Sequence, residues 1–201
     1  LVALAEFSSK KLGNVDILSQ SAANKLLNAV LSNTVKDFKI DPKLPKMSII
    51  LIDDGAHKLD LGVFEAFPYP ITFALKPSRK GAVKAMQAYR SWGYEVVVLS
   101  EFADDVLSDE ARTILETDLQ KLPEAVAVME ARPGGLQAQP AILTEVTNLL
   151  KSSGHGLVLF PKGLNTGNSL AKITGVQIAK ISKSINGRDQ NARQIQKILD
   201  Q

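Results

Sequence analysis

The stretch Met47-Ser-Ile-Ile-Leu-Ile-Asp-Asp-Gly55 decides the fold class of this chain. Residues 49–52 are all Ile or Leu, and two aspartates and a glycine follow them. A short run that is apolar on both faces is typical of a strand that is buried on both sides in a parallel sheet. We therefore expect a buried strand here, with the aspartates at its carboxyl end.

The same pattern recurs along the chain. Further strands are expected at 71–75, 95–99, 125–129, 156–160 and, with a weaker pattern, 176–181. The stretches between them have the apolar spacing of amphipathic helices, near 58–66, 79–92, 108–120, 138–153 and 165–173, with a last helix at 189–201. Buried strands that alternate with crossover helices predict an α/β fold of parallel β/α repeats. The periodicity leaves an open sheet and a barrel as alternatives.

Residues 1–45 are interpreted separately, as a helical leader before a main domain at 46–201. Apolar residues at 26, 27, 30 and 31 have helical spacing, and Asp41-Pro-Lys-Leu-Pro45 ends the pattern. The chain begins at Leu1 rather than at a methionine. This beginning is consistent with a processed chain that has lost a signal peptide or an anchor.

Composition excludes several classes of function. The hydrophobic share is 45% and the charged share is 22%, as in ordinary globular proteins. With no cysteine, the chain has no disulfide, thiolate metal site or cysteine nucleophile. Residues 1–46 hold seven Lys and four acidic residues, whereas the rest holds 17 charges of each sign. A nucleic-acid partner is therefore not expected, and no apolar run is long enough for a membrane span.

Polar residues follow the expected strands, at the edge where α/β folds collect their sites. They are Asp53, Asp54, Lys76, Ser78, Ser100, Glu101, Glu130, Arg132 and Lys162. Of these, Ser100, Glu101, Glu130, Arg132 and Lys162 are the candidate ligand-binding residues. Arg132 could clamp a carboxylate or a sugar hydroxyl, or else pair with Glu130 or Glu101.

The aspartate pair has two interpretations. Asp53 and Asp54 could hold a divalent cation, with His57 in the same loop as a third ligand. They could instead cap the following helix. His155, the second histidine, precedes a strand and is expected at the opposite edge.

Three segments together resemble the divergent polysaccharide deacetylase family, namely Met47–Gly55, Phe67-Pro-Tyr-Pro-Ile-Thr-Phe-Ala74 and Gly93-Tyr-Glu-Val96. Later segments at 126–130, 154–158 and 163–166 resemble an alphaproteobacterial branch of that family. The resemblance spans about 47–201. It implies a distorted β/α barrel, here incomplete because the chain stops one or two units short, and it places Asp53 and Asp54 at the metal-binding and base positions.

The chain departs from that family where imidazoles are expected. Leu99 and Ala131 stand at the two histidine positions, and Pro161-Lys-Gly163 replaces an Asp-Ser-Arg segment. The resemblance therefore implies an inactive relative with no cofactor, in the periplasm or cell envelope, although the composition also fits the cytoplasm.

Three functions remain open at this point. The first is a non-catalytic domain that binds a glycan or an envelope partner at the strand ends. The second is an active carbohydrate deacetylase, with zinc or another divalent metal on Asp53, Asp54 and His57 or Glu130. The third is a protein-interaction module that docks an envelope partner through the basic segment 1–45.

Overall fold

The computed structural model describes residues 2–6, 48–55, 62–65, 71–103, 105–162, 170 and 173–185. The strands are β1 (Val2–Glu6), β2 (Ser48–Asp53), β3 (Ile71–Leu75), β4 (Glu95–Ser100), β5 (Ala125–Glu130), β6 (Gly156–Leu159) and β7 (Ile178–Ser184). The helices are α2 (Gly62–Glu65), α3 (Ala82–Ser91), α4 (Ser108–Lys121) and α5 (Pro140–Ser153).

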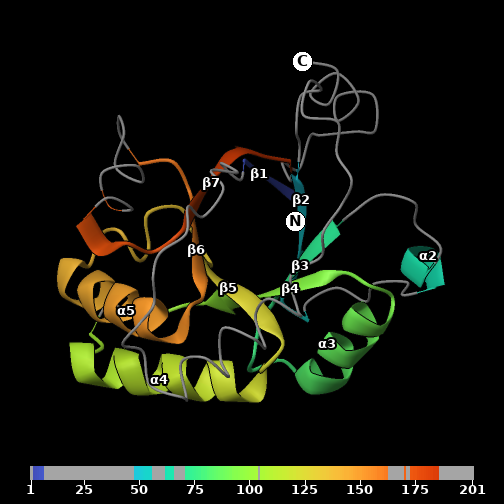
Figure 1. The fold of residues 1–201 in the computed structure, drawn as a ribbon, viewed down its shortest axis with the longest axis horizontal. Helices are drawn as coiled ribbons and strands as arrows, with labels where there is room; N and C mark the ends of the chain where they lie inside the picture. The colour runs from blue at the N-terminus through green and yellow to red at the C-terminus, as the bar shows by residue number, and fades with distance from the viewer. Residues whose placement is uncertain are drawn as a thin grey trace, which may run out of the picture.

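Six parallel strands form the framework of the molecule. Strands β2 to β7 lie side by side in chain order, and every neighbouring pair is parallel. They curl into a half-barrel, with helices alternating along the chain (Figure 1). The predicted α/β fold of parallel β/α repeats is thus confirmed.

Strand β1 differs from the prediction for the leader. Val2–Glu6 pairs antiparallel with β2 on one side and with β7 on the other, and so closes the ring of strands. The sequence predicted a helical leader over 1–45, and this prediction is wrong at 2–6; residues 7–45 lie outside the described residues. The alanine and leucine residues of this segment favour a helix locally. The edges of β2 and β7, however, offer backbone hydrogen-bond partners on both sides, and this pairing overrides the local preference.

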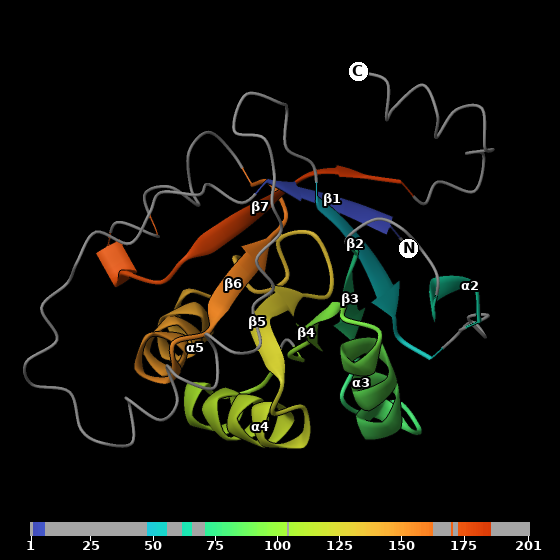
Figure 2. The ribbon, with the colours of Figure 1, turned by 45° about the vertical axis from the view of Figure 1, so that its right-hand side comes forward.

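The sheet separates two apolar layers. Helices α3, α4 and α5 lie along the outer side of the curled sheet (Figure 2). Side chains that point outward, such as Phe73, Val98 and Leu157, pack with these helices. Alternate side chains point inward and form a smaller cluster inside the barrel, which includes Val97 and Met129. This alternation decides which strand-end residues face the helices and which face the barrel interior.

Most predicted elements agree with the structure to within a few residues. Helix α4 (Ser108–Lys121) matches the predicted 108–120, whereas the last strand runs from Ile178 to Ser184 rather than over 176–181. The predicted helical pattern at 26–31, nearly all of 165–173 and the helix at 189–201 lie outside the described residues. None of the described helices is long and apolar enough to cross a membrane.

Candidate functional site at the carboxyl edge of the sheet

Asp53 ends β2 and faces the helix layer rather than the barrel interior. Leu51, two residues earlier on the same face, packs against the outer cluster. The Asp53 side chain is only 2% exposed. Its Oδ2 accepts a hydrogen bond from the Tyr89 hydroxyl at 2.7 Å and lies 3.1 Å from Arg79 Nη1. Its Oδ1 accepts a 3.3 Å bond from the backbone N–H of Gly55. Both oxygens of this carboxylate are engaged.

The neighbours of Asp53 are themselves held in place. Tyr89 stacks on Phe73 with ring centroids 3.7 Å apart, and its ring is fully buried. Burial raises the pKa of Tyr89, and the hydrogen bond to Asp53 raises it further, so the phenol stays protonated and donates. Gly55 has φ +81° and lies so close to Arg79 that a Cβ would come within 3.0 Å of that side chain. A glycine at this position therefore lets the backbone pass close to the Asp53–Arg79 ion pair.

The described residues do not fit a metal ion at this edge. Asp54 is exposed, whereas Asp53 is turned into the helix layer and paired with a cation. His57 lies outside the described residues. Within the part of the chain that the structure describes, no three His, Cys, Asp or Glu side chains gather as a metal site would require. An arginine beside Asp53 also competes with any cation for its carboxylate.

The two positions at which the family resemblance expects histidine lie against the interior apolar cluster. Leu99 belongs to that cluster and is 6% exposed, and Ala131 packs against its edge. Neither side chain can donate a nitrogen to a metal. The barrel interior at this end is apolar where a metal centre would need polar ligands.

Glu130 ends β5 and is buried, with 1% of the residue exposed. Its carboxylate accepts bonds from the backbone N–H of Phe160 at 2.6 Å, from Gln137 Nε2 at 2.8 Å and from the N–H of Leu136 at 3.3 Å. Burial raises the pKa of Glu130, and these hydrogen bonds offset the shift only in part. Glu130 therefore joins the ends of β5 and β6 to the loop after β5, which is a structural role.

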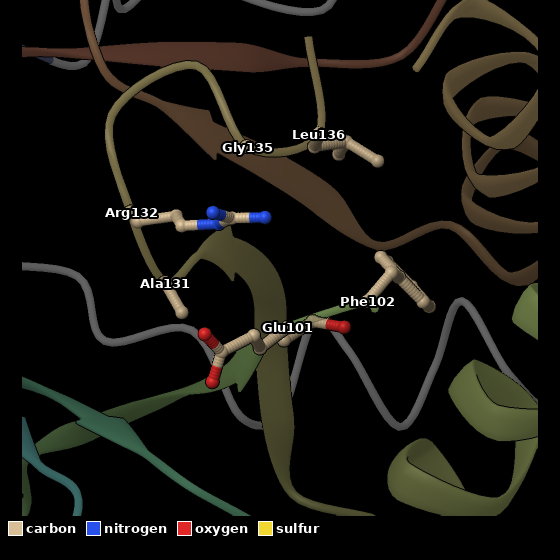
Figure 3. A pocket seen from close by; sticks show the side chains of 7 residues that line it. Glu101, Phe102, Ala131, Arg132, Gly135 and Leu136 are labelled. Carbon is tan, nitrogen blue, oxygen red and sulfur yellow. The ribbon is translucent and has the colours of Figure 1, made fainter. Parts of the chain in front are cut away.

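A hollow lies between the ends of β4 and β5 (Figure 3). It is lined from one side by residues that end or follow β4 and from the other by the loop after β5, namely Ser100, Glu101, Phe102, Ala131, Arg132, Gly135 and Leu136. Ser100 Oγ is buried and has no hydrogen-bond partner. A buried hydroxyl without a partner is uncommon in folded proteins, and Ser100 is one of the residues that line the hollow.

Charged side chains surround this hollow. Lys76, which follows β3, pairs with Glu101 at 3.4 Å, and both side chains are partly exposed. Lys162, which follows β6, donates to the carbonyl of Gln137 at 3.0 Å. The Arg132 side chain extends into the hollow between the Gly135–Leu136 segment and the segment that holds Glu101 and Phe102 (Figure 3). The sequence offered Glu101 and Glu130 as ion-pair partners for Arg132. In the structure Glu101 pairs with Lys76, and the carboxylate of Glu130 accepts from backbone N–H groups.

His155 lies at the opposite edge, immediately before β6, as its place in the sequence indicated. Its Nδ1 is 2.8 Å from Ser153 Oγ. Burial lowers the pKa of His155, against a smaller opposing effect of a hydrogen bond with the Ala125 backbone. It cannot join the residues at the carboxyl edge.

The structure thus divides the predicted site residues into two groups. Ser100, Glu101 and Arg132 come together around the hollow, and Lys162 lies over the same loop. Asp53 and Glu130 are instead held by other protein groups. Sequence reasoning missed Arg79 and Tyr89. For Tyr89 the sequence held one signal. A tyrosine on the buried face of a predicted helix usually has a hydrogen-bond partner for its hydroxyl.

The fold and site together define an α/β protein in which six parallel strands form a curled half-barrel, with a small polar hollow at their carboxyl edge. No family model matches the sequence, and no curated protein matches it significantly. Among solved structures, an uncharacterized protein, ATU2773 from Agrobacterium tumefaciens C58, is similar with a TM-score of 0.63. The match has 14% sequence identity and covers 85% of this chain and 76% of that one. At this identity the likeness shows the fold alone.

Proposed function

We propose that this chain is a non-catalytic relative of the polysaccharide deacetylases that binds a glycan at the bacterial cell envelope. One observation carries the proposal. The carboxylate of Asp53, at a position where a deacetylase needs a free acid, is buried in the helix layer and bonded to Arg79 and Tyr89.

A catalytic zinc would need at least three protein ligands and an open position for water. Asp53 offers no free oxygen in this arrangement, and Leu99 and Ala131 offer no donor atoms. The tetrahedral intermediate of deacetylation would also lack a positive centre beside its oxyanion. These features support a role without hydrolysis.

The hollow between β4 and β5 supports a binding role. It combines an unpartnered hydroxyl on Ser100, charged groups on Arg132 and Glu101, and apolar faces on Phe102 and Leu136. Sites for small polar ligands have this mixture, because apolar contact excludes water while a few polar groups fix orientation. Its volume of about 10 Å³ holds about one water molecule, so a single hydroxyl of a sugar would enter it while the ring stays outside.

The test has two arms. Purified protein with added zinc is incubated with N-acetylglucosamine oligomers, and acetate release is compared between the wild type and Asp54→Ala. Calorimetry then measures binding of two disaccharides, chitobiose and N-acetylglucosaminyl-N-acetylmuramic acid. We expect the same background acetate for both proteins and binding of a disaccharide at one site.

Acetate release that exceeds the background and disappears in Asp54→Ala would show an active deacetylase and overturn the non-catalytic role. Failure of both disaccharides to bind would overturn the glycan-binding role.

A further inference from the structure

The loop after β5, residues 131–139, forms one wall of the hollow between β4 and β5 (Figure 3). Hydrogen bonds inside this loop make turns. The backbone N–H of Gly135 donates to the carbonyl of Arg132 at 3.1 Å, and that of Ala138 donates to the carbonyl of Gly134 at 2.9 Å. Turns of this kind fix the local shape of a loop, but not its place against the sheet. The position of the wall therefore depends on bonds that leave the loop.

Gln137 makes bonds of that second kind. Its side-chain Nε2 donates to Glu130 Oε1 at 2.8 Å and to the carbonyl oxygen of Phe160 at 2.9 Å, which uses both of its N–H groups. Its own carbonyl oxygen accepts from Lys162 Nζ at 3.0 Å. Gln137 thus joins the loop after β5 to the end of β5 and to the segment after β6, although it is not one of the residues that line the hollow.

Glu130 is the fixed point for the Gln137 side chain. It belongs to β5, and its buried carboxylate also accepts from the backbone N–H groups of Phe160 at 2.6 Å and Leu136 at 3.3 Å. Two carboxylate oxygens have enough acceptor sites for all three donors. Hydrogen bonds to an ionised acceptor are stronger than those between neutral groups. The strand therefore holds the loop through one carboxylate.

The fixed point lies next to the opposite wall of the hollow. Ser100, which belongs to that wall, is the register partner of Glu130 on the neighbouring strand. The volume between the walls is about 10 Å³. A shift of about 1 Å in either wall is comparable with the radius of a water molecule, so it would close such a hollow or open it to further waters. A hollow of this size is therefore sensitive to the exact place of the loop.

We infer that Gln137 is a positioning residue of the candidate site. It holds the loop after β5 against the ends of β5 and β6, and so sets the width of the hollow without lining it. The inference rests on the proposed glycan-binding function, because it takes the hollow as the place where a sugar hydroxyl binds. Removal of the Gln137 side-chain bonds should release the wall and weaken binding in a protein that is still folded.

Two glutamines of the loop make a matched pair of variants. Gln137→Leu removes bonds that leave the loop, whereas Gln139→Leu removes a 3.3 Å bond to the carbonyl of Gly135 inside it. In the ligand-free, isotope-labelled full chain, amides at 131–136 should exchange with solvent about tenfold faster in Gln137→Leu than in Gln139→Leu. Calorimetry with chitobiose should show about tenfold weaker binding for Gln137→Leu and nearly wild-type binding for Gln139→Leu.

A conservative variant separates this role from general damage. Gln137→Glu keeps the size of the side chain but brings a second carboxylate to Glu130, so at pH 8 it should weaken binding as Gln137→Leu does. At pH 5 the two carboxylates can share a proton, the side chain donates to Glu130 again, and binding should recover towards the wild type. The neighbouring charged groups Glu101, Arg132 and Lys162 have partners in the structure. They are also present in the wild type, so comparison at each pH removes their contribution.

The outcomes distinguish the two proposals. Equal amide exchange at 131–136 in Gln137→Leu and Gln139→Leu would overturn the role given to Gln137 and leave glycan binding intact. Faster exchange in Gln137→Leu with unchanged affinity for chitobiose would overturn it too, because the wall would then move without affecting the site. Failure of the wild type to bind either disaccharide would overturn the glycan-binding function, and amide exchange would still decide whether Gln137 holds the loop.

Discussion

The ends of β2 and β4 lie at the same edge of the sheet, yet their polar side chains differ in one respect. Asp53, at the end of β2, has partners for both carboxylate oxygens. Ser100, at the end of β4, is almost as deeply buried and has no partner for its hydroxyl. A strand-end position therefore does not by itself make a binding site. A buried polar group that has no hydrogen-bond partner says more about where a ligand could bind.

The largest expected effect comes from removing the cation beside Asp53. Arg79→Ala leaves a buried carboxylate without its ion partner, and we expect a loss of about 3 kcal/mol in the free energy of unfolding. Denaturation in urea measures it. Lys76→Ala removes the cation of a partly exposed pair and should change stability by less than about 0.5 kcal/mol. Similar losses in both variants would contradict the distinction between a buried and an exposed pair.

A smaller loss is expected from Tyr89→Phe. This variant removes the hydroxyl that donates to Asp53 at 2.7 Å and keeps the ring that stacks on Phe73. Because the acceptor is charged and buried, we expect destabilisation by about 2 kcal/mol in the same assay. Unchanged stability would mean that Arg79 alone satisfies this carboxylate.

At the end of β4 the sign of the effect should reverse. Ser100→Ala removes an unpartnered hydroxyl, so we expect the ligand-free protein to gain up to about 1 kcal/mol in the free energy of unfolding. Ser153→Ala is the matched control, because its hydroxyl lies 2.8 Å from His155 Nδ1 and its removal should destabilise. A clear loss of stability in Ser100→Ala would show that this hydroxyl is satisfied after all.

The last effect concerns pH and the opposite edge of the sheet. Burial lowers the pKa of His155 below its ordinary 6.5, so below that pH the unfolded chain binds a proton that the folded protein does not. Stability should therefore fall as the pH drops from 6.5 towards the lowered pKa, by less than about 1.4 kcal/mol per pH unit. Comparing His155→Gln with the wild type at pH 7 and pH 5 isolates this contribution. Parallel pH profiles for the two proteins would contradict it.

Much of the fold was predictable because each buried strand carries its own signal. The runs at 49–52 and 71–75 are apolar on both faces, and only a covered parallel sheet buries both. Strand β1 was not predictable in the same way. Its pairing depends on the free edges of β2 and β7, which are distant in sequence.

The candidate site was predictable at the level of the sheet edge and no further. Strand ends indicated where Ser100, Glu101 and Arg132 would lie, and the structure places them around one hollow. The direction of Asp53 could not be derived, because it depends on where the helix that carries Tyr89 packs. Arg79 reaches Asp53 from the segment after β3, and no local pattern marks that contact.

The most direct measurement is amide chemical-shift mapping of the full, isotope-labelled chain titrated with N-acetylglucosaminyl-N-acetylmuramic acid. The proposed site predicts saturable changes at residues 100–102 and 131–136, with little change at 53–55. Changes centred on 53–55, with the β4–β5 hollow unaffected, would contradict it and return the binding site to the aspartate pair.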